Sequence, residues 1–188
     1  MQKTTILSSL LIIGASAMLC SPLAHAANLK LSSPTLQNGA VMDMSQVYDG
    51  LGCTGGNTSP EISWKDIPDG TKSFAVTVYD PDAPTGSGWW HWMVVNIPAD
   101  ARGLPAGAGS ADGKKLPTGA IQITTDFGKP GYNGACPPAD HKNHRYEFTV
   151  YALKDVIPVD PKATAAAIGF YINSLKLSSA QIIVLYKR

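Results

Sequence analysis

The sequence of 188 residues has little cysteine, little histidine and little charge, and each shortage argues against a class of protein. Charged residues make up 15% of the chain, and the formal net charge is +1 at pH 7. No basic run is present, so we do not expect binding to nucleic acid or to an anionic membrane through a charged surface. With 3 cysteines and 4 histidines in the whole chain, we expect no metal site and no cofactor.

The longest apolar run lies at the N-terminus. Lys3 precedes an apolar segment at 6–19 that is too short to span a bilayer. Residues 24–26 read Ala-His-Ala, which fits the small-x-small pattern of a cleavage site. We therefore predict that residues 1–26 form a signal peptide, and that cleavage follows Ala26.

The remaining residues, 27–188, are enough for a single domain with its own hydrophobic core. The predicted signal peptide indicates export, so we expect a periplasmic protein. Residues 27–188 contain no further apolar run long enough to cross a membrane, so we expect no integral membrane segment. Cys20 does not predict a lipid anchor, because Leu19 stands where a lipoprotein signal needs a small residue. Without Lys3, the basic residues equal the 14 acidic ones, and the mature chain is close to neutral.

Cys53 and Cys136 are the cysteines that remain after the predicted cleavage. In an exported chain such a pair is expected to form a disulfide. The bridge would close a loop of roughly 80 residues, which corresponds to about 4 kcal/mol of stability in the chain-entropy description. The alternative is a pair of free thiols, which mass spectrometry without reduction would detect.

Most of the chain alternates short strand patterns with segments rich in glycine and proline. Strands are predicted at 29–33, 61–64, 74–79, 92–97, 120–124, 145–153 and 181–186, with a weaker pattern at 46–48. The run at 92–97 is apolar at both parities, which predicts a strand covered on both faces. Strands outweigh helices, so the predicted fold class is mainly β, a sandwich.

Longer loops and one helix complete the prediction. The segments 98–115 and 126–138 are predicted to be loops, the first of them on the surface. A helix is predicted at 163–175, after an N-cap at Asp160 and a proline at 161. A long loop inside a compact domain is often functional, which draws attention to 126–138.

The segment between the strands at 74–79 and 92–97 carries polar side chains in an unusual setting. Prolines at 81 and 84 restrict the backbone, so Asp80 and Asp82 lie on a stiff corner. His91 stands at the entrance of the following strand. These residues could form the floor of a pocket. They could equally belong to a rigid hairpin loop whose aspartates cap backbone N–H groups.

A second segment of the same kind ends at the strand 145–153. Cys136 and Pro137 belong to the glycine- and proline-rich loop, and His144 follows shortly afterwards. His144 and Tyr146 are two residues apart, so their side chains should lie on the same face of the strand. Two histidines at strand entrances, a tyrosine and a tethered loop favour a binding site over a purely structural loop.

Several of these motifs together resemble the phosphatidylethanolamine-binding protein family, also called Raf kinase inhibitor-like proteins. The motifs are Asp-Pro-Asp-Ala-Pro at 80–84, Trp-His-Trp at 90–92, Cys-Pro-Pro at 136–138 and His-Arg-Tyr at 144–146. Asn-Thr-Ser-Pro at 57–60 is similar to the bacterial YbhB/YbcL branch, and the predicted signal and cysteine pair resemble its exported members.

The resemblance implies an antiparallel β-sandwich with a few peripheral helices and a small anion-binding pocket at one end. By this resemblance the pocket is lined by Asp80, Asp82, His91, Pro137, His144 and Tyr146. One departure is Trp90, which replaces the first histidine of a pair that is frequent in the family. The chain also ends on a predicted strand, whereas the eukaryotic members end on a helix.

We expect this pocket to bind a small anion such as phosphate, a carboxylate or a phospholipid head group. The aspartates are expected to fix the tautomers of the histidines and to raise their pKa values. An alternative is a modulator or inhibitor of a protein partner such as a protease or kinase, and a homodimer is compatible with the sequence. A hydrolase using His91 and His144 is disfavoured, because Ser87 lacks the spacing of a nucleophile elbow.

Overall fold

The computed structural model describes residues 28–160 and 163–188. The predicted signal peptide lies outside these residues. Within them, strands predominate and one helix is present. The strands are β1 (Lys30–Ser32), β2 (Asp49–Gly50), β3 (Cys53–Thr54), β4 (Ile62–Lys65), β5 (Ser73–Asp80), β6 (Trp89–Pro98), β7 (Gly103–Leu104), β8 (Ile121–Gln122), β9 (His144–Leu153) and β10 (Lys176–Tyr186). The helix is α1 (Ala165–Leu175).

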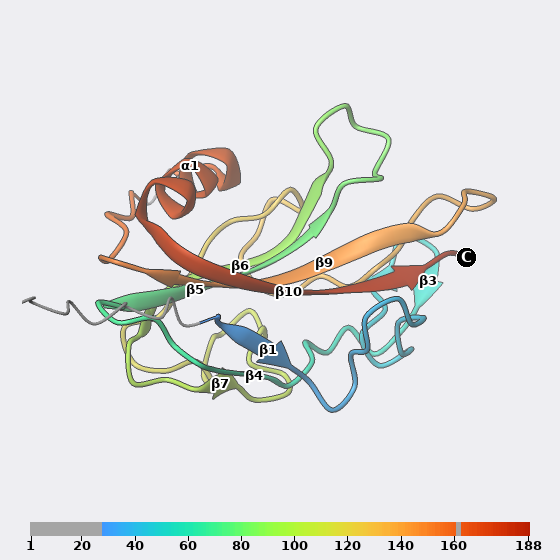
Figure 1. The fold of residues 1–188 in the computed structure, drawn as a ribbon. Coiled ribbons are helices and arrows are strands. Elements are labelled where there is room, and N and C mark those ends of the chain that lie inside the picture. Colours follow the sequence, from blue (N-terminus) through green and yellow to red (C-terminus); the bar gives the residue numbers. More distant parts are fainter. Residues whose placement is uncertain (1–27, 161–162) are drawn as a thin grey trace, which may run out of the picture.

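Two antiparallel sheets form the body of the protein. The larger sheet has five strands in the order β10-β9-β5-β6-β8, and the smaller has three in the order β1-β4-β7. Figure 1 shows the smaller sheet against one face of the larger sheet and α1 against the opposite face. The predicted class, a mainly β protein with antiparallel sheets, is confirmed. In the described part of the chain, however, a single helix stands in place of the few that were expected.

The strand β6 is buried on both faces, as the continuous apolar run predicted. Val94 and Val95 point to opposite faces, and both are 0% exposed. Val94 belongs to the core between the sheets, together with Phe74 and Phe148. Val95 packs with Ile168 of α1 in a second core. Because each face of the large sheet is covered, the central strands can be apolar throughout.

The helix α1 begins later than the sequence suggested. Its N-cap is Thr164, whose side chain accepts a hydrogen bond from the backbone N–H of Ala167, so the prediction of Asp160 as N-cap is wrong. The helix ends at Leu175, and β10 starts at Lys176 without a loop. The predicted strand at 181–186 is therefore the second half of a longer strand. Its first half contains exposed and half-exposed serines, which hide a strand pattern.

Two further local predictions need correction. The segment 98–115 was expected on the surface, but it contains β7, which pairs with β4, and it buries Leu104 and Ala108. The weak strand pattern at 46–48 is not a strand; Val47 forms an isolated bridge with Ala135. Both segments are irregular in sequence and are ordered by contacts that lie far away along the chain.

Antiparallel pairing brings the functional candidates to one end of the large sheet. The last residue of β5, Asp80, pairs with Trp89 at the start of β6. On the other side of β5, Tyr79 pairs with Glu147 near the start of β9. The end of β5 therefore meets the beginnings of β6 and β9. Among the described residues, no helix is long and apolar enough to cross a membrane.

Candidate functional site

A cavity of about 250 Å³ opens at this end of the sheet. Its lining includes Asp80, His91, Pro137, His144 and Tyr146, all of which were predicted from the sequence. Asp82, the remaining predicted site residue, is not part of the lining. Polar groups occupy the floor, where the strands end, and apolar side chains form the walls.

Asp80 and His144 form the buried centre of the floor. The Nδ1 atom of His144 lies 2.8 Å from Oδ2 of Asp80, and the side chains are 1% and 4% exposed. A carboxylate accepts hydrogen bonds, so Nδ1 of His144 carries the proton and Nε2 is its other functional nitrogen. The second oxygen of Asp80 accepts the backbone N–H of Asp82 at 2.8 Å. Asp80 thus fixes the tautomer of His144, as the sequence suggested.

His91 is fixed in the same tautomer by backbone oxygens. Its Nδ1 atom lies 2.7 Å from the carbonyl oxygen of Asn133 and 3.2 Å from that of Gly134. Carbonyl oxygens only accept, so Nδ1 of His91 carries a proton as well. Burial lowers the pKa of His91, although the backbone carbonyls and Asp80 act in the opposite direction. Asp80 raises the pKa of His91, as expected, but burial outweighs this effect, so the net shift is downward and Nε2 of His91 is a hydrogen-bond acceptor at neutral pH.

Tyr146 presents a buried hydroxyl group without a partner. The residue is 1% exposed, and its oxygen has no hydrogen-bond partner among the described residues. Burial, followed by the charge of Asp80, raises the pKa of Tyr146, so its phenol stays protonated. Asp80 acts on the pKa of the phenol by its charge and as a nearby acceptor, but the two groups do not meet the geometry of a hydrogen bond, so the hydroxyl is left without a partner. A buried hydroxyl without a partner is destabilising, and a bound ligand would satisfy it.

Asp82 supports the site from outside the cavity. Its carboxylate binds Arg145 in a bidentate manner, with Nε to Oδ2 at 2.8 Å and NH2 to Oδ1 at 2.9 Å, and Oδ2 also accepts the backbone N–H of Arg145. The guanidinium of Arg145 lowers the pKa of Asp82 to about 2. Arg145 lies between His144 and Tyr146 in sequence and points to the opposite face of β9. This pair joins the corner after β5 to the beginning of β9.

The disulfide joins two walls of the cavity. Cys53 and Cys136 are bonded, with a Cα–Cα distance of 6.0 Å, as the sequence predicted. Cys136 and Pro137 line one wall, and Leu51, in the turn between β2 and β3, lines another. Leu51 has a left-handed backbone with φ of 53° and is 73% exposed. A large apolar side chain is unusual in that conformation, which favours glycine or asparagine.

Sequence reasoning missed the aromatic wall. Trp89 and Phe127 line the cavity and meet edge to face, with ring centroids 5.6 Å apart. Phe127 also contacts the rings of His91 and Tyr48. Phe127 lies in the loop 126–138 that was noted as a long functional candidate, and its position there was the available signal. Its contacts come from residues distant along the chain, so the sequence pattern could not reveal them.

The described residues contain no group of three or more histidine, cysteine, aspartate or glutamate side chains arranged to hold a metal ion. The polar groups of the cavity are instead hydrogen-bond donors and acceptors, one of them the unpartnered hydroxyl of Tyr146, around an open space lined mostly by apolar residues. Such a site is suited to binding a small molecule with a polar end.

The fold and the cavity define a class of antiparallel β-sandwich proteins with a small binding site at one end of the larger sheet. A family model described as "Phosphatidylethanolamine-binding protein" matches residues 32–187. The chain therefore belongs to the phosphatidylethanolamine-binding protein family, and the resemblance seen in the sequence is confirmed. The family is one of binding proteins, in agreement with the prediction of a protein that is not an enzyme.

Known relatives support this assignment over most of the chain. YbcL of Escherichia coli (strain K12) is 53% identical over 165 residues, which is 87% of this chain and 90% of the relative. YbhB of the same organism is 51% identical over 159 residues, 84% of this chain and 99% of the relative. The crystal structure of E. coli YbcL superposes with a TM-score of 0.84 and covers 86% of this chain and 99% of that chain. LppC of Mycobacterium tuberculosis (strain ATCC 25618 / H37Rv), named as a lipoprotein, is 31% identical over 87% of this chain and 74% of its own length.

Proposed function

We propose that the cavity binds a small oxyanion, either free or as the head group of a larger molecule. The observation that carries this proposal is the hydroxyl of Tyr146, which is buried, protonated and without a partner in the floor of the cavity. The binding residues would be Asp80, His91, Pro137, His144 and Tyr146, with Asp82 as a support. The hydroxyl of Tyr146 would donate to an anion oxygen.

The histidines would complete the set of hydrogen bonds. The Asp80 carboxylate accepts hydrogen bonds from Nδ1 of His144 and from the backbone N–H of Asp82, which hold it in place and leave Nε2 as the nitrogen of His144 that Asp80 does not engage. A protonated His91 would add a further donor at Nε2, whereas a neutral His91 would accept a hydrogen bond from the ligand. Each charge-assisted hydrogen bond to an anion is worth roughly 1.5–3 kcal/mol.

We also propose that the protein is exported to the periplasm as a single domain of residues 27–188, after removal of a signal peptide at 1–26. The disulfide supports this proposal, because such bonds persist in oxidising compartments. The similarity to LppC, a protein named as a lipoprotein, also favours export. N-terminal sequencing of protein from the periplasmic fraction should begin at Ala27. Recovery of a chain beginning at Met1, or of cytoplasmic protein only, would contradict export.

The anion site can be tested by titration calorimetry with two probes, sulfate and phosphate, at pH 5 and pH 8. Sulfate keeps its charge across this range and has no O–H group, whereas hydrogen phosphate at pH 8 can donate one hydrogen bond. The pKa of His91 lies below its ordinary value of 6.5, so this ring is neutral at pH 8. We therefore expect phosphate to bind more tightly than sulfate at pH 8.

Lowering the pH should favour sulfate. An anion that receives a hydrogen bond from protonated His91 raises the pKa of that ring, so binding takes up a proton and the affinity rises as the pH falls. We expect sulfate to bind about tenfold more tightly at pH 5 than at pH 8, the value of one additional charge-assisted hydrogen bond. Equal sulfate affinity at both pH values would argue against the role of His91. No binding of either probe would reject the anion site.

A further inference from the structure

His141 extends the Asp80–His144 pair toward the solvent. The Nδ1 atom of His141 lies 3.4 Å from Nε2 of His144, and the ring centroids are 5.6 Å apart. The resulting chain runs from the buried carboxylate of Asp80 through the buried ring of His144 to an exposed ring. His141 was not among the residues predicted from the sequence.

The contact between His141 and His144 occupies Nε2 of His144, the ring nitrogen that an anion would need. His144 has two ring nitrogens, and Nδ1 is already bonded to Asp80. Only Nε2 remains for a ligand, and this atom faces Nδ1 of His141. An anion accepts hydrogen bonds, so it can use Nε2 only when that atom carries a proton, and in that state Nε2 faces Nδ1 of His141 as its acceptor.

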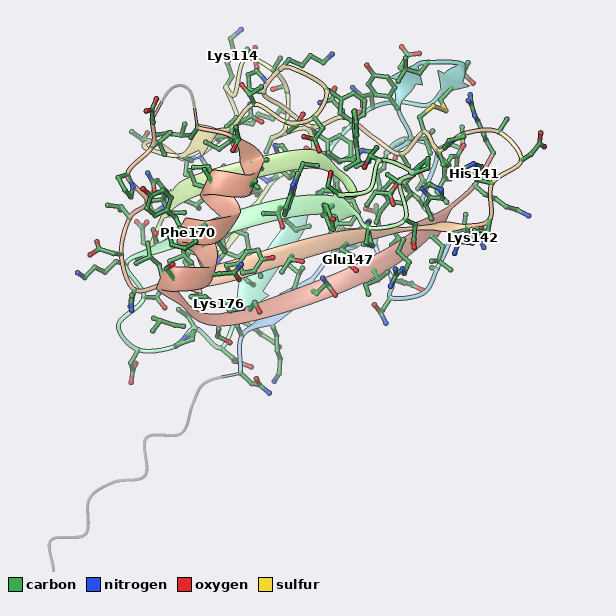
Figure 2. The ribbon with its side chains drawn as sticks, turned by 90° about the horizontal axis from the view of Figure 1, so that it is seen from above. Lys114, His141, Lys142, Glu147, Phe170 and Lys176 are labelled. Atoms are coloured by element: carbon green, nitrogen blue, oxygen red, sulfur yellow. A yellow bond between two sulfur atoms is a disulfide. The ribbon has the colours of Figure 1, made fainter. Side chains whose placement is uncertain are left out.

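His141 lies on an exposed segment, where its side chain has room to move. Residues 138–143 are all exposed, and His141 is not part of the cavity lining. Figure 2 shows His141 and Lys142 on the loop that precedes β9, at the end of the molecule away from Phe170 of α1. The side chain of His141 can therefore leave His144 without disturbing the core, whereas His144 itself is held by Asp80.

We propose that His141 is an internal competitor of the anion for Nε2 of His144. This inference rests on the proposed anion-binding function and adds a residue that sets its affinity. In the free protein, Nδ1 of His141 is the hydrogen-bond partner of Nε2 of His144. When an anion enters, the hydrogen bond from His144 passes to the anion and His141 turns to the solvent. Giving up the hydrogen bond to His141 in this way reduces the apparent affinity by about 2- to 10-fold.

The test compares sulfate affinities of the wild type, His141→Ala, His141→Asn and Lys142→Ala at one pH. The alanine variant removes the competitor, so sulfate should bind about 2- to 10-fold more tightly than to the wild type. Asparagine places a polar atom close to the position of Nδ1, so His141→Asn should return the affinity toward the wild-type value. Lys142→Ala removes a neighbouring exposed cation and should not increase the affinity.

A second measurement, ¹⁵N NMR of the histidine rings, detects the contact between His141 and His144 directly. In ¹⁵N-labelled protein, the Nε2 resonance of His144 should differ between the free wild type and free His141→Ala, and saturation with sulfate should remove most of this difference. Weaker binding by His141→Ala would show that His141 assists the anion, and unchanged binding would show that it is a bystander. Either result overturns the inference and leaves the proposed function intact. If the wild type binds no sulfate at all, the proposed function fails and the competitor role fails with it.

Discussion

At the scale of the residue, two buried tyrosines show how one hydrogen bond separates a structural side chain from a functional candidate. Tyr132 is 4% exposed, and its hydroxyl donates to the carbonyl oxygen of Gln46 at 2.8 Å. Tyr146 is 1% exposed, and its hydroxyl has no partner among the described residues. Both side chains have the same chemistry, so their different surroundings decide their roles.

Replacing Tyr146 by phenylalanine should separate binding from stability. The Tyr146→Phe variant loses a donor to the anion, so phosphate affinity should fall about tenfold or more. Its free energy of unfolding should be unchanged or slightly higher, because an unsatisfied buried hydroxyl is removed. Calorimetric titration and urea unfolding measure the two effects.

Tyr132→Phe is the matched control for this experiment. It should cost about 1 kcal/mol of stability, since it leaves a carbonyl without its donor, and phosphate affinity should stay at the wild-type value. If Tyr146→Phe destabilises the protein and leaves the affinity unchanged, the hydroxyl has a structural role instead.

Asp82 shows the limit of sequence reasoning at single residues. Asp80 and Asp82 share a stiff corner, and the sequence gives no reason to treat them differently. In the structure Asp80 is buried against His144, whereas Asp82 turns outward to Arg145. The alternation along β9, with His144 and Tyr146 inward and Arg145 outward, decides the partners. The pairing of β5 with β9, which the sequence does not specify, is needed to see this.

The Asp82→Asn variant should lose stability in a pH-dependent manner. The folded pKa of Asp82, about 2, lies below the ordinary value of 3.8, so its contribution is present above pH 4 and is lost as the pH falls toward 2. Because Arg145 is half exposed, we expect a loss of about 1 kcal/mol at pH 7. Urea unfolding should show the difference from the wild type at pH 7 and its disappearance near pH 2. A difference that is the same at both pH values would contradict the ion pair as its source.

At the scale of the element, strands were predicted better than their boundaries and partners. The central strands β5, β6 and β9 appear where the apolar patterns placed them, because burial on both faces leaves a clear signal. The edge strand β10 was found only in its second half, since its first half carries serines toward solvent. The two-residue strands β2 and β7 have no strand pattern of their own: β2 forms a short hairpin with β3 in a glycine-rich segment, and β7 is formed by its pairing with the distant strand β4.

The helix α1 provides a test that lies away from the site. The Thr164→Ala variant removes the acceptor for the N–H of Ala167, so the free energy of unfolding should fall by about 1 kcal/mol. Ser174→Ala is the control, because its hydroxyl donates to a carbonyl within the same helix and its loss should change stability by less than about 0.5 kcal/mol. Urea unfolding at constant m-value measures both. Equal effects of the two changes would mean that Thr164 does not act as the cap.

At the scale of the whole molecule, the cavity depends on segments that are distant along the chain. Its floor comes from the ends of β5, β6 and β9, whose polar residues could be found in the sequence. Its walls come from the turn at Leu51 and from the loop containing Phe127, which have no strand or helix pattern. The family resemblance predicted the residues of the floor, because these residues belong to the sequence motifs that carry the resemblance. Of the wall residues, Pro137 was predicted because it belongs to a motif, whereas Leu51 and Phe127 were not, because only packing between loops brings them to the cavity.

The disulfide is the covalent link between these distant parts, and its removal should affect both stability and binding. A Cys53→Ser, Cys136→Ser variant opens a loop with a sequence separation of 83 residues, so the free energy of unfolding should fall by about 4 kcal/mol. The turn at Leu51 would also be freed from the wall at Pro137, which should weaken phosphate binding several-fold even where near-ultraviolet circular dichroism shows a folded protein. Titration at a temperature well below the unfolding midpoint separates the two effects. Wild-type affinity in a folded but less stable variant would show that the bond stabilises the whole domain and does not organise the cavity.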